Sequence, residues 1–481
     1  MPTSTADAGP FALGAAAAEL LERRLEAAIA RARERRRRAL AAVTVPVDPA
    51  VDVAAVVLGG RRADERFFCL EQPDRDRFAL ATLGQAAVVE ARGERRIAEV
   101  VAACRELAAE AVAGDPAAAA TAPPAAGPVW VGGLAFAPEG GSAPEWQSLA
   151  PAQFVLPEVA FARLGEEARL TVAAVVDGDE DASRVAERLC ARLAALSPAD
   201  MPLADPDPVA APRVAGAAPP EHYEAAVERA VERIRAGEIE KVVLAREVRV
   251  HAPQPIDPAP VFDGLRTAFP ACYCYCVGTP ELAFVGASPE LLIRRDGARA
   301  QTVALAGTTR RSADPAVDAH LGEQLLRSAK NRGEQAIVTR RIERVLRPVS
   351  VWVAAADQPS LVKVQNVQHL ATPIRAQLRE PVALLELAER LHPTPAVGGE
   401  PPEAVRLIPA LEGLDRGWYA GAVGWANLDE DGELCVALRC ALLRDRVAHL
   451  YAGCGIVAES EPAAELAETE VKLQALLPLL A

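Results

Sequence analysis

The chain has 481 residues, of which 51% are hydrophobic and 25% charged, and its 52 basic and 66 acidic residues leave a net charge of −14. This is the composition of an ordinary soluble globular protein, and the acidic balance argues against nucleic-acid-binding and membrane-surface proteins, which usually present a basic face. Nine cysteines without a paired CxxC spacing, no signal-peptide pattern and no run of 18 apolar residues together predict a cytoplasmic protein with reduced thiols.

The first part of the chain divides at two segments that are poor in regular structure. Residues 1–45 are expected to form a partly disordered helical extension, because an Ala/Leu-rich pattern is the only feature there. Residues 46–205 carry strand-like runs such as VAAVVLGG and VWVGGLAF, and they are expected to form the N-terminal part of the fold. An Ala/Pro/Gly-rich loop is predicted at 113–128. Six prolines between positions 201 and 220 predict a linker, since proline disrupts helices and central strands.

Residues 217–481 are expected to form the C-terminal region of the fold, which carries the candidate reactive groups. It opens with the amphipathic pattern EHYEAAVERAVERIRAGE, which predicts a helix that ends at Gly237. The string KVVLAREVRV then predicts a strand with Lys241 at its first position. A lysine that is desolvated there could act as a base, although a lysine at the start of a strand is more often a solvent-exposed end.

Two further strings contain candidate reactive groups. ELAFVGASPELLIRR predicts a strand, a turn at Ser288 and Pro289, and a second strand, with Glu290 at the exit of the turn among leucines. A carboxyl group among apolar neighbours tends to keep its proton, as a general acid must. QTVALAGTTRR places Gly307 and Thr308 in a turn that allows close approach and offers a hydroxyl group.

Carboxylates from two distant helices complete the pattern. Glu334 lies three and four residues before apolar positions in SAKNRGEQAIV, at the inner edge of a predicted helix. Near the C-terminus, Glu465, Glu468 and Lys472 are spaced i, i+3 and i+7 on one predicted helical face that follows a Gly-rich turn. Carboxylate oxygens suit Mg2+. The alternative is an exposed helix with a Glu468–Lys472 pair that contributes roughly 0.3 to 0.5 kcal/mol.

With these strings, the chain resembles the chorismate-using enzymes, and within them the isochorismate synthases. The matching strings are KVVLAR, GASPELL, LAGTTRR, SAKNRGEQAIV, NVQHLATPI, LHPTPAVGG, GWYAGAVGW, VALRCA and GCGIVAESEPAAELAETEVKL, in the order of the family. They span Lys241 to Leu473. The resemblance implies an α+β fold in which two packed, mostly antiparallel β-sheets are flanked by helices.

The resemblance also implies a reaction and roles for individual residues. The reaction is the Mg2+-dependent conversion of chorismate to isochorismate, by attack of water at C2 with loss of the C4 hydroxyl. Lys241 would activate the water and Glu290 would protonate the departing hydroxyl. The implied metal ligands are Glu334, Glu468 and, through water, Glu465. The implied substrate-binding residues are Gly307, Thr308, His369, Ala396, Tyr419, Arg439, Gly455 and Lys472.

Several alternatives remain open from the sequence. A salicylate synthase would use the same acid and base and then eliminate pyruvate, and a non-catalytic chorismate-binding regulatory protein would need neither group. The relatives that make aminodeoxychorismate carry a nucleophilic lysine where this chain has Ala306, so water is the expected nucleophile and no glutaminase subunit is expected. Two residues depart from the family pattern: Asn331 stands where many relatives have an acidic residue, which predicts weaker Mg2+ binding, and Gln335 replaces a frequent histidine. For His369 the alternative is a core histidine. We expect a monomer, with a dimer as the alternative.

Overall fold

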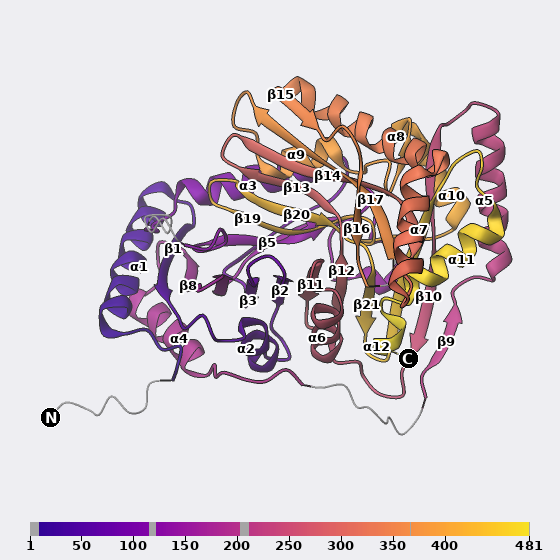
Figure 1. Cartoon of the computed structure of the whole chain (residues 1–481). Helices are drawn as coiled ribbons and strands as arrows, with labels where there is room; N and C mark the ends of the chain where they lie inside the picture. Colours follow the sequence, from indigo (N-terminus) through magenta and orange to yellow (C-terminus); the bar gives the residue numbers. More distant parts are fainter. Residues whose placement is uncertain (1–8, 115–121, 203–210, 366, 481) are drawn as a thin grey trace.

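The computed structural model describes residues 9–114, 122–202, 211–365 and 367–480, and its strands form two large sheets (Figure 1). Sheet A contains, in spatial order, β1 (Ala39–Pro46), β8 (Glu167–Val176), β7 (Val159–Leu164), β3 (Phe78–Leu83), β2 (Phe67–Gln72), β11 (Tyr273–Gly278), β12 (Ala283–Ser288), β21 (Cys440–Arg444), β22 (Val447–Ile456), β10 (Lys241–His251) and β18 (Gly399–Glu400), with β9 (Arg213–Gly216) also paired to β10. Sheet B contains β15 (Ser350–Ala355), β17 (Val367–Leu378), β14 (Arg299–Arg310), β13 (Leu291–Asp296), β20 (Gly432–Val436), β19 (Ala422–Asn427), β5 (Val129–Leu134), β6 (Ala152–Leu156) and β4 (Ala87–Ala91), with β16 (Ser360–Lys363) also paired to β17.

Helices flank both sheets. They are α1 (Ala15–Arg35), α2 (Val53–Gly60), α3 (Arg96–Ala109), α4 (Ala182–Ala194), α5 (Pro220–Arg235), α6 (Pro258–Ala268), α7 (Pro315–Arg327), α8 (Ala329–Leu346), α9 (Leu384–Leu391), α10 (Ile408–Glu412), α11 (Pro462–Leu473) and α12 (Leu477–Leu480), with the 3-10 turns η2 (Pro144–Trp146), η3 (Arg347–Val349) and η4 (Pro402–Leu407). Every ladder between named strands is antiparallel, which confirms the predicted fold class. No helix within the described ranges combines the length and the apolar character that a membrane crossing requires.

The alternation of side chains along sheet A separates two hydrophobic cores. In β11, Tyr273 and Tyr275 face a core that is shared with sheet B, whereas Cys274 and Cys276 face a second core against the helices. The second core contains residues of α1, α2, α4 and α6. Cys272 belongs to the second core as well, so Cys272, Cys274 and Cys276 are buried packing residues without a disulfide.

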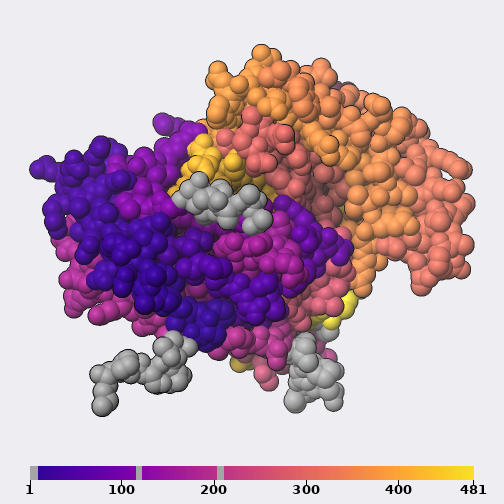
Figure 2. Space-filling model, turned by 60° about the vertical axis from the view of Figure 1, so that its left-hand side comes forward, coloured from indigo at the N-terminus to yellow at the C-terminus, as the bar shows by residue number. Residues whose placement is uncertain are grey.

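Both parts of the chain contribute strands to both sheets. In sheet A, β2 from the N-terminal part pairs with β11 from the C-terminal part, and in sheet B, β5 pairs with β19. Figure 2 shows the indigo and magenta surface of the earlier residues continuing into the orange surface of the later ones. The segment 201–220 thus connects two parts of one intertwined structure.

Three details differ from the predicted organisation. The boundary expected at residue 45 falls inside β1, which pairs with β8 along its whole length. Residues 15–45 therefore belong to the fold. Residues 1–8 lie outside the described ranges. VAAVVLGG forms α2 and not a strand, because Asp52 caps the helix by accepting from the Ala55 N–H, and a continuous apolar run has no periodicity to distinguish the two. The linker predicted at 201–220 contains the strand β9, and its residues 203–210 lie outside the described ranges. In the loop predicted at 113–128, residues 115–121 also lie outside the described ranges.

Candidate active site

Residues from both sheets and from two helices surround one cavity of about 920 Å3, counted with the part that is open to solvent. The cavity is lined by most of the residues singled out in the sequence: Glu290, Gly307, Thr308, Glu334, His369, Ala396, Tyr419, Arg439, Gly455, Glu465, Glu468 and Lys472. Lys241 is not among the lining residues, but it lies next to Gly455, which is one of them: a Cβ atom on that glycine would lie 3.0 Å from the Lys241 Nζ. The glycine therefore leaves room for the lysine.

Lys241 is buried completely at the start of β10, and its ammonium group is paired. Its Nζ donates to Glu334 Oε1 on α8 at 2.8 Å, and only 1% of its side chain is exposed. A buried charge needs such a partner, because an unpaired ammonium would have lost its hydration without compensation. The pair joins the first residue of a sheet A strand to the helix that packs on sheet B.

Glu290 lies where the chain crosses from one sheet to the other. β12 ends at Ser288 in sheet A and β13 begins at Leu291 in sheet B, so the predicted turn is a crossover and not a hairpin. The side chain is buried, and burial raises the pKa of its carboxyl group to about 8, although the charges of Lys241 and Arg439 act in the opposite direction. Glu290 is therefore protonated at neutral pH and can donate that proton.

Arg439, His369 and Thr308 form a hydrogen-bonded chain on another wall. Arg439 Nη2 donates to His369 Nε2 at 2.6 Å, and since a guanidinium can only donate, the imidazole proton lies on Nδ1, which is 3.1 Å from Thr308 Oγ1. Burial and the charge of Arg439 lower the pKa of His369 well below its usual value, so the ring is neutral. Arg439 Nη1 is buried and has no hydrogen-bond partner among the described residues, which leaves one donor for a ligand.

A bulge in sheet B shapes this wall. The β14–β17 register shifts between Ala306 and Thr308, and the intervening Gly307 has a φ of 74°, a left-handed conformation that glycine adopts without strain. Because of the shift, Thr308 pairs directly with His369.

Two carboxylates of α11 face the cavity, and a lysine partners each of them. Glu465 Oε1 lies 3.1 Å from Lys330 Nζ, and Glu468 Oε1 lies 2.8 Å from Lys472 Nζ. Lys472 also donates to the Gly453 carbonyl at 2.8 Å, which fixes the helix against β22. Burial raises the pKa of Glu465; for Glu468, burial acts in the same direction but Lys472 outweighs it and lowers the pKa.

These carboxylates have the chemistry that a hard dication prefers. One potential ligand atom from each of Cys454, Glu465 and Glu468 lies within 4.8 Å of the other two. Burial raises the pKa of the Cys454 thiol well above its usual value, so the thiol stays protonated and the site offers oxygen ligands. The Glu334 carboxylate lies on the same cavity but is bound to Lys241. The donor set fits Mg2+, with Glu465 and Glu468 as its centre.

Lys330 was missed in the sequence, and two departures from the family pattern have structural roles. Lys330 lies four residues before Glu334 in α8, one helical turn away, and this spacing could have identified it. Asn331 also lines the cavity, and its Nδ2 donates to Ser328 Oγ at 2.8 Å. Gln335 is buried and donates to the Ala304 carbonyl and to Thr372 Oγ1, both at 2.9 Å, so it joins α8 to sheet B.

Comparisons with known proteins identify the family of the chain. The family model described as "Chorismate binding enzyme" matches residues 27–481. The "Salicylate biosynthesis isochorismate synthase" of Pseudomonas aeruginosa is 38% identical over 455 residues, 94% of this chain and 92% of that protein. "Isochorismate synthase MenF" of Bacillus subtilis is 38% identical over 357 residues, 74% of this chain and 75% of that protein.

A solved structure extends the similarity to the fold. The structure of MenF, the menaquinone-specific isochorismate synthase from Escherichia coli, has a TM-score of 0.76 at 26% identity and covers 92% of this chain and 95% of that chain. The family model and the long matches cover both the N-terminal and the C-terminal part of the fold. The chain is therefore a member of the chorismate binding enzyme family, with isochorismate synthases among its relatives along most of its length.

Proposed function

We propose that this protein is a Mg2+-dependent isochorismate synthase, which converts chorismate to isochorismate by attack of water at C2 and loss of the hydroxyl at C4. Two observations carry the proposal: Glu290, a carboxyl group that keeps its proton, lines the cavity, and Lys241, a buried lysine, is bonded to Glu334, which lines the same cavity. Lys241 and Glu290 come from different segments, β10 and the crossover after β12, so an acid and a base can act on different parts of one substrate.

The charges of the cavity support a dianionic substrate. Chorismate carries two carboxylates, and Arg439 and Lys472 supply cations on different walls. The free Nη1 of Arg439 would donate to one carboxylate, while the neutral His369 holds the guanidinium in place from the other side. Tyr419 and Ala396 line the remaining space, and Ala306 offers no amine nucleophile there.

Glu465, Glu468 and Glu334 would hold the Mg2+ ion. When bound, Mg2+ would neutralise and orient a carboxylate of the substrate. An ion at Glu334 would compete with Lys241 for the same carboxylate, because the lysine is bonded to it in this structure.

The proton steps balance without any further reactant. Once its ammonium group has lost a proton to solvent, Lys241 removes a proton from the attacking water as the oxygen bonds to C2. The ring double bonds shift toward C4, and Glu290 gives its proton to the C4 hydroxyl as the C4–O bond breaks. One water enters and one leaves. The cycle then closes when Lys241 loses its proton and Glu290 regains one through solvent.

Product analysis tests the proposal. Purified protein is incubated with chorismate and Mg2+, without ammonia or glutamine, and the products are separated by chromatography. Isochorismate as the sole product supports the proposal. Salicylate together with pyruvate would instead identify a salicylate synthase, and chorismate binding without turnover would identify a non-catalytic protein.

A further inference from the structure

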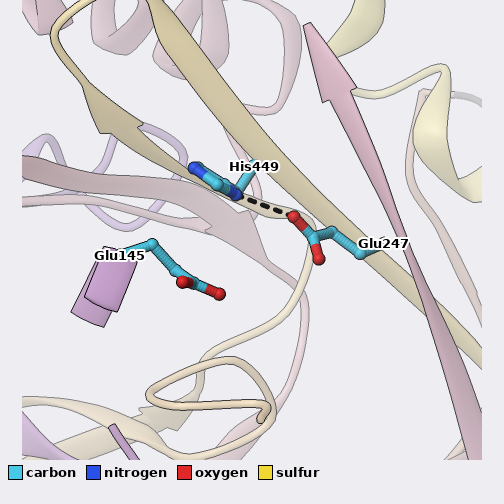
Figure 3. A group of neighbouring side chains, drawn as sticks. All are labelled: Glu145, Glu247 and His449. Carbon is cyan, nitrogen blue, oxygen red and sulfur yellow. Dashed lines mark hydrogen bonds and ion pairs between the residues drawn. The ribbon is translucent and has the colours of Figure 1, made fainter. Parts of the chain in front are cut away.

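A second group of potential metal ligands lies outside the active site. Glu145 on η2, Glu247 on β10 and His449 on β22 each place one ligand atom within 4.8 Å of the other two. Figure 3 shows the Glu145 side chain extending from its short helical turn toward Glu247. The dashed line in the same view marks the hydrogen bond between His449 Nδ1 and Glu247 Oε1, at 2.7 Å. Glu247 and His449 are buried, and Glu145 is half-buried.

The backbone fixes the position of each of the three residues. The β10–β22 register places Glu247 opposite Tyr451 and Arg249 opposite His449, so these side chains share one face of sheet A. Arg444 Nη1 donates to the carbonyls of Pro144 and Glu145, at 3.0 and 3.3 Å, and this anchors the turn that carries Glu145. The Glu145 carboxylate itself has no hydrogen bond or ion pair with the described residues.

A buried hydroxyl provides independent evidence for a ligand. Tyr451 is 3% exposed, and its hydroxyl has no hydrogen-bond partner among the described residues. Tyr451 stands directly opposite Glu247 in the β10–β22 ladder, so its side chain lies on the same face of sheet A as those of Glu247 and His449. A buried tyrosine hydroxyl without a partner is uncommon in native proteins, and a bound water on a metal ion would satisfy it.

We propose that Glu145, Glu247 and His449 form a binding site for a Zn2+-class transition-metal ion, with a metal-bound water as the hydrogen-bond partner of the Tyr451 hydroxyl. One imidazole and two carboxylates are a mixed nitrogen and oxygen set, which favours such an ion over Mg2+. Metal binding uses the neutral imidazole with its proton on Nε2, so the bond from Nδ1 to Glu247 is exchanged for two metal bonds.

Arg249 sets the strength of this site. Its Nε lies 2.6 Å from Glu247 Oε1, so the guanidinium competes with a metal ion for the same carboxylate. The Arg249 side chain is 41% exposed and can turn to solvent when the ion binds. We therefore expect substitution of Arg249 by glutamine to tighten metal binding.

The proposed metal site borders the active site, because Tyr451 also lines the active-site cavity. The Tyr451 ring stacks on Trp146, which follows Glu145, with 5.7 Å between centroids, and on Tyr419 with 5.2 Å. Tyr419 lines the active-site cavity. A metal ion here would therefore hold η2 and the wall formed by Tyr419 in place.

The test is a Zn2+ titration of the full-length protein, stripped with a chelator and kept in excess Mg2+, followed by calorimetry. We expect one Zn2+ per chain, at least about tenfold weaker binding for Glu145→Gln and His449→Gln, and tighter binding for Arg249→Gln. Glu145→Gln is the main variant, because the half-exposed position tolerates the amide. Glu139→Gln, an exposed carboxylate on the same loop, is the matched control and should bind like the wild type.

Competing metal positions are distinguished by two further measurements. Glu468→Gln should leave Zn2+ affinity unchanged, and the Co2+-substituted protein should lack a thiolate charge-transfer band. Zn2+ binding that is unaffected by Glu145→Gln, or that is weakened by Glu468→Gln, would overturn the proposal, as would a thiolate band, which would place the ion at Cys454. Absence of Zn2+ binding to the wild type would overturn it as well.

Discussion

Replacing Glu290 by glutamine should reduce turnover and, at neutral to alkaline pH, increase stability. Gln has the same shape as Glu but cannot ionise and cannot donate an acidic proton. Burial raises the pKa of Glu290 from 4.5 to about 8. Below pH 4.5 the protonated Glu290 contributes fully to the free energy of unfolding of the wild-type protein. This contribution is lost progressively as the pH rises toward 8, because the carboxyl group ionises more easily in the unfolded chain.

The size of the effect follows from the pKa shift. A shift of about 3.5 units corresponds to about 4 to 5 kcal/mol of unfolding free energy at full ionisation. The difference in unfolding free energy between Glu290→Gln and the wild type should therefore be small at pH 4.5 and should grow by about that amount by pH 9. Loss of the acid should lower kcat by about 100-fold to 10,000-fold.

The assay is urea denaturation of both proteins between pH 4.5 and 9, together with kcat at each pH where they are folded. Wild-type activity should fall by about tenfold between pH 7 and pH 9 as Glu290 loses its proton. Glu228→Gln, which removes an exposed carboxylate from α5, controls for the change in net charge. A stability difference that does not vary with pH, or a kcat for Glu290→Gln within tenfold of the wild type, would refute the reasoning.

Three further predictions concern the substrate and the metal ion. Arg439→Lys keeps the charge but loses the forked donor geometry, so KM for chorismate should rise by about tenfold or more while kcat changes less; an unchanged KM would contradict the proposed contact. Asn331→Asp adds a carboxylate beside the proposed Mg2+ site, so the Kd for Mg2+ in calorimetry should fall by about three- to tenfold, and equal or weaker binding would count against the location of the ion. Removal of Mg2+ by EDTA should abolish turnover and added Mg2+ should restore it, whereas full activity in EDTA would exclude the metal dependence. Glu468→Gln should raise the Kd for Mg2+ by at least about tenfold.

The sequence predicted the residues around the cavity in more detail than it predicted the fold. Short strings with fixed spacing identified residues that lie together in three dimensions, such as Glu334 on α8 and Glu468 on α11, because helical spacing defines a face. The fold class came from the resemblance, since periodicity alone indicated only a mixture of helices and strands. The VAAVVLGG segment shows the limit: six consecutive buried residues have no polar face, and the cap at Asp52 decides for a helix.

Long-range pairings could not be derived from local patterns. Nothing near Ser288 indicates that the next strand joins the other sheet, yet this crossover is what buries Glu290 between the sheets. The bond between Lys241 and Glu334 joins residues 93 positions apart and depends on how β10 packs beside α8. The site of Glu145, Glu247 and His449 has the same origin, because η2 reaches two neighbouring strands from a distant part of the chain.

The origin of the product hydroxyl tests the central claim, that Lys241 activates a water molecule which attacks C2 while Glu290 releases the C4 hydroxyl. Chorismate is converted in H2(18)O with Mg2+, and the isochorismate formed at low conversion is analysed by mass spectrometry. The wild-type enzyme should introduce one 18O atom at C2, and Lys241→Ala should form no product above background. Isochorismate that contains no 18O, or undiminished turnover by Lys241→Ala, would contradict the account.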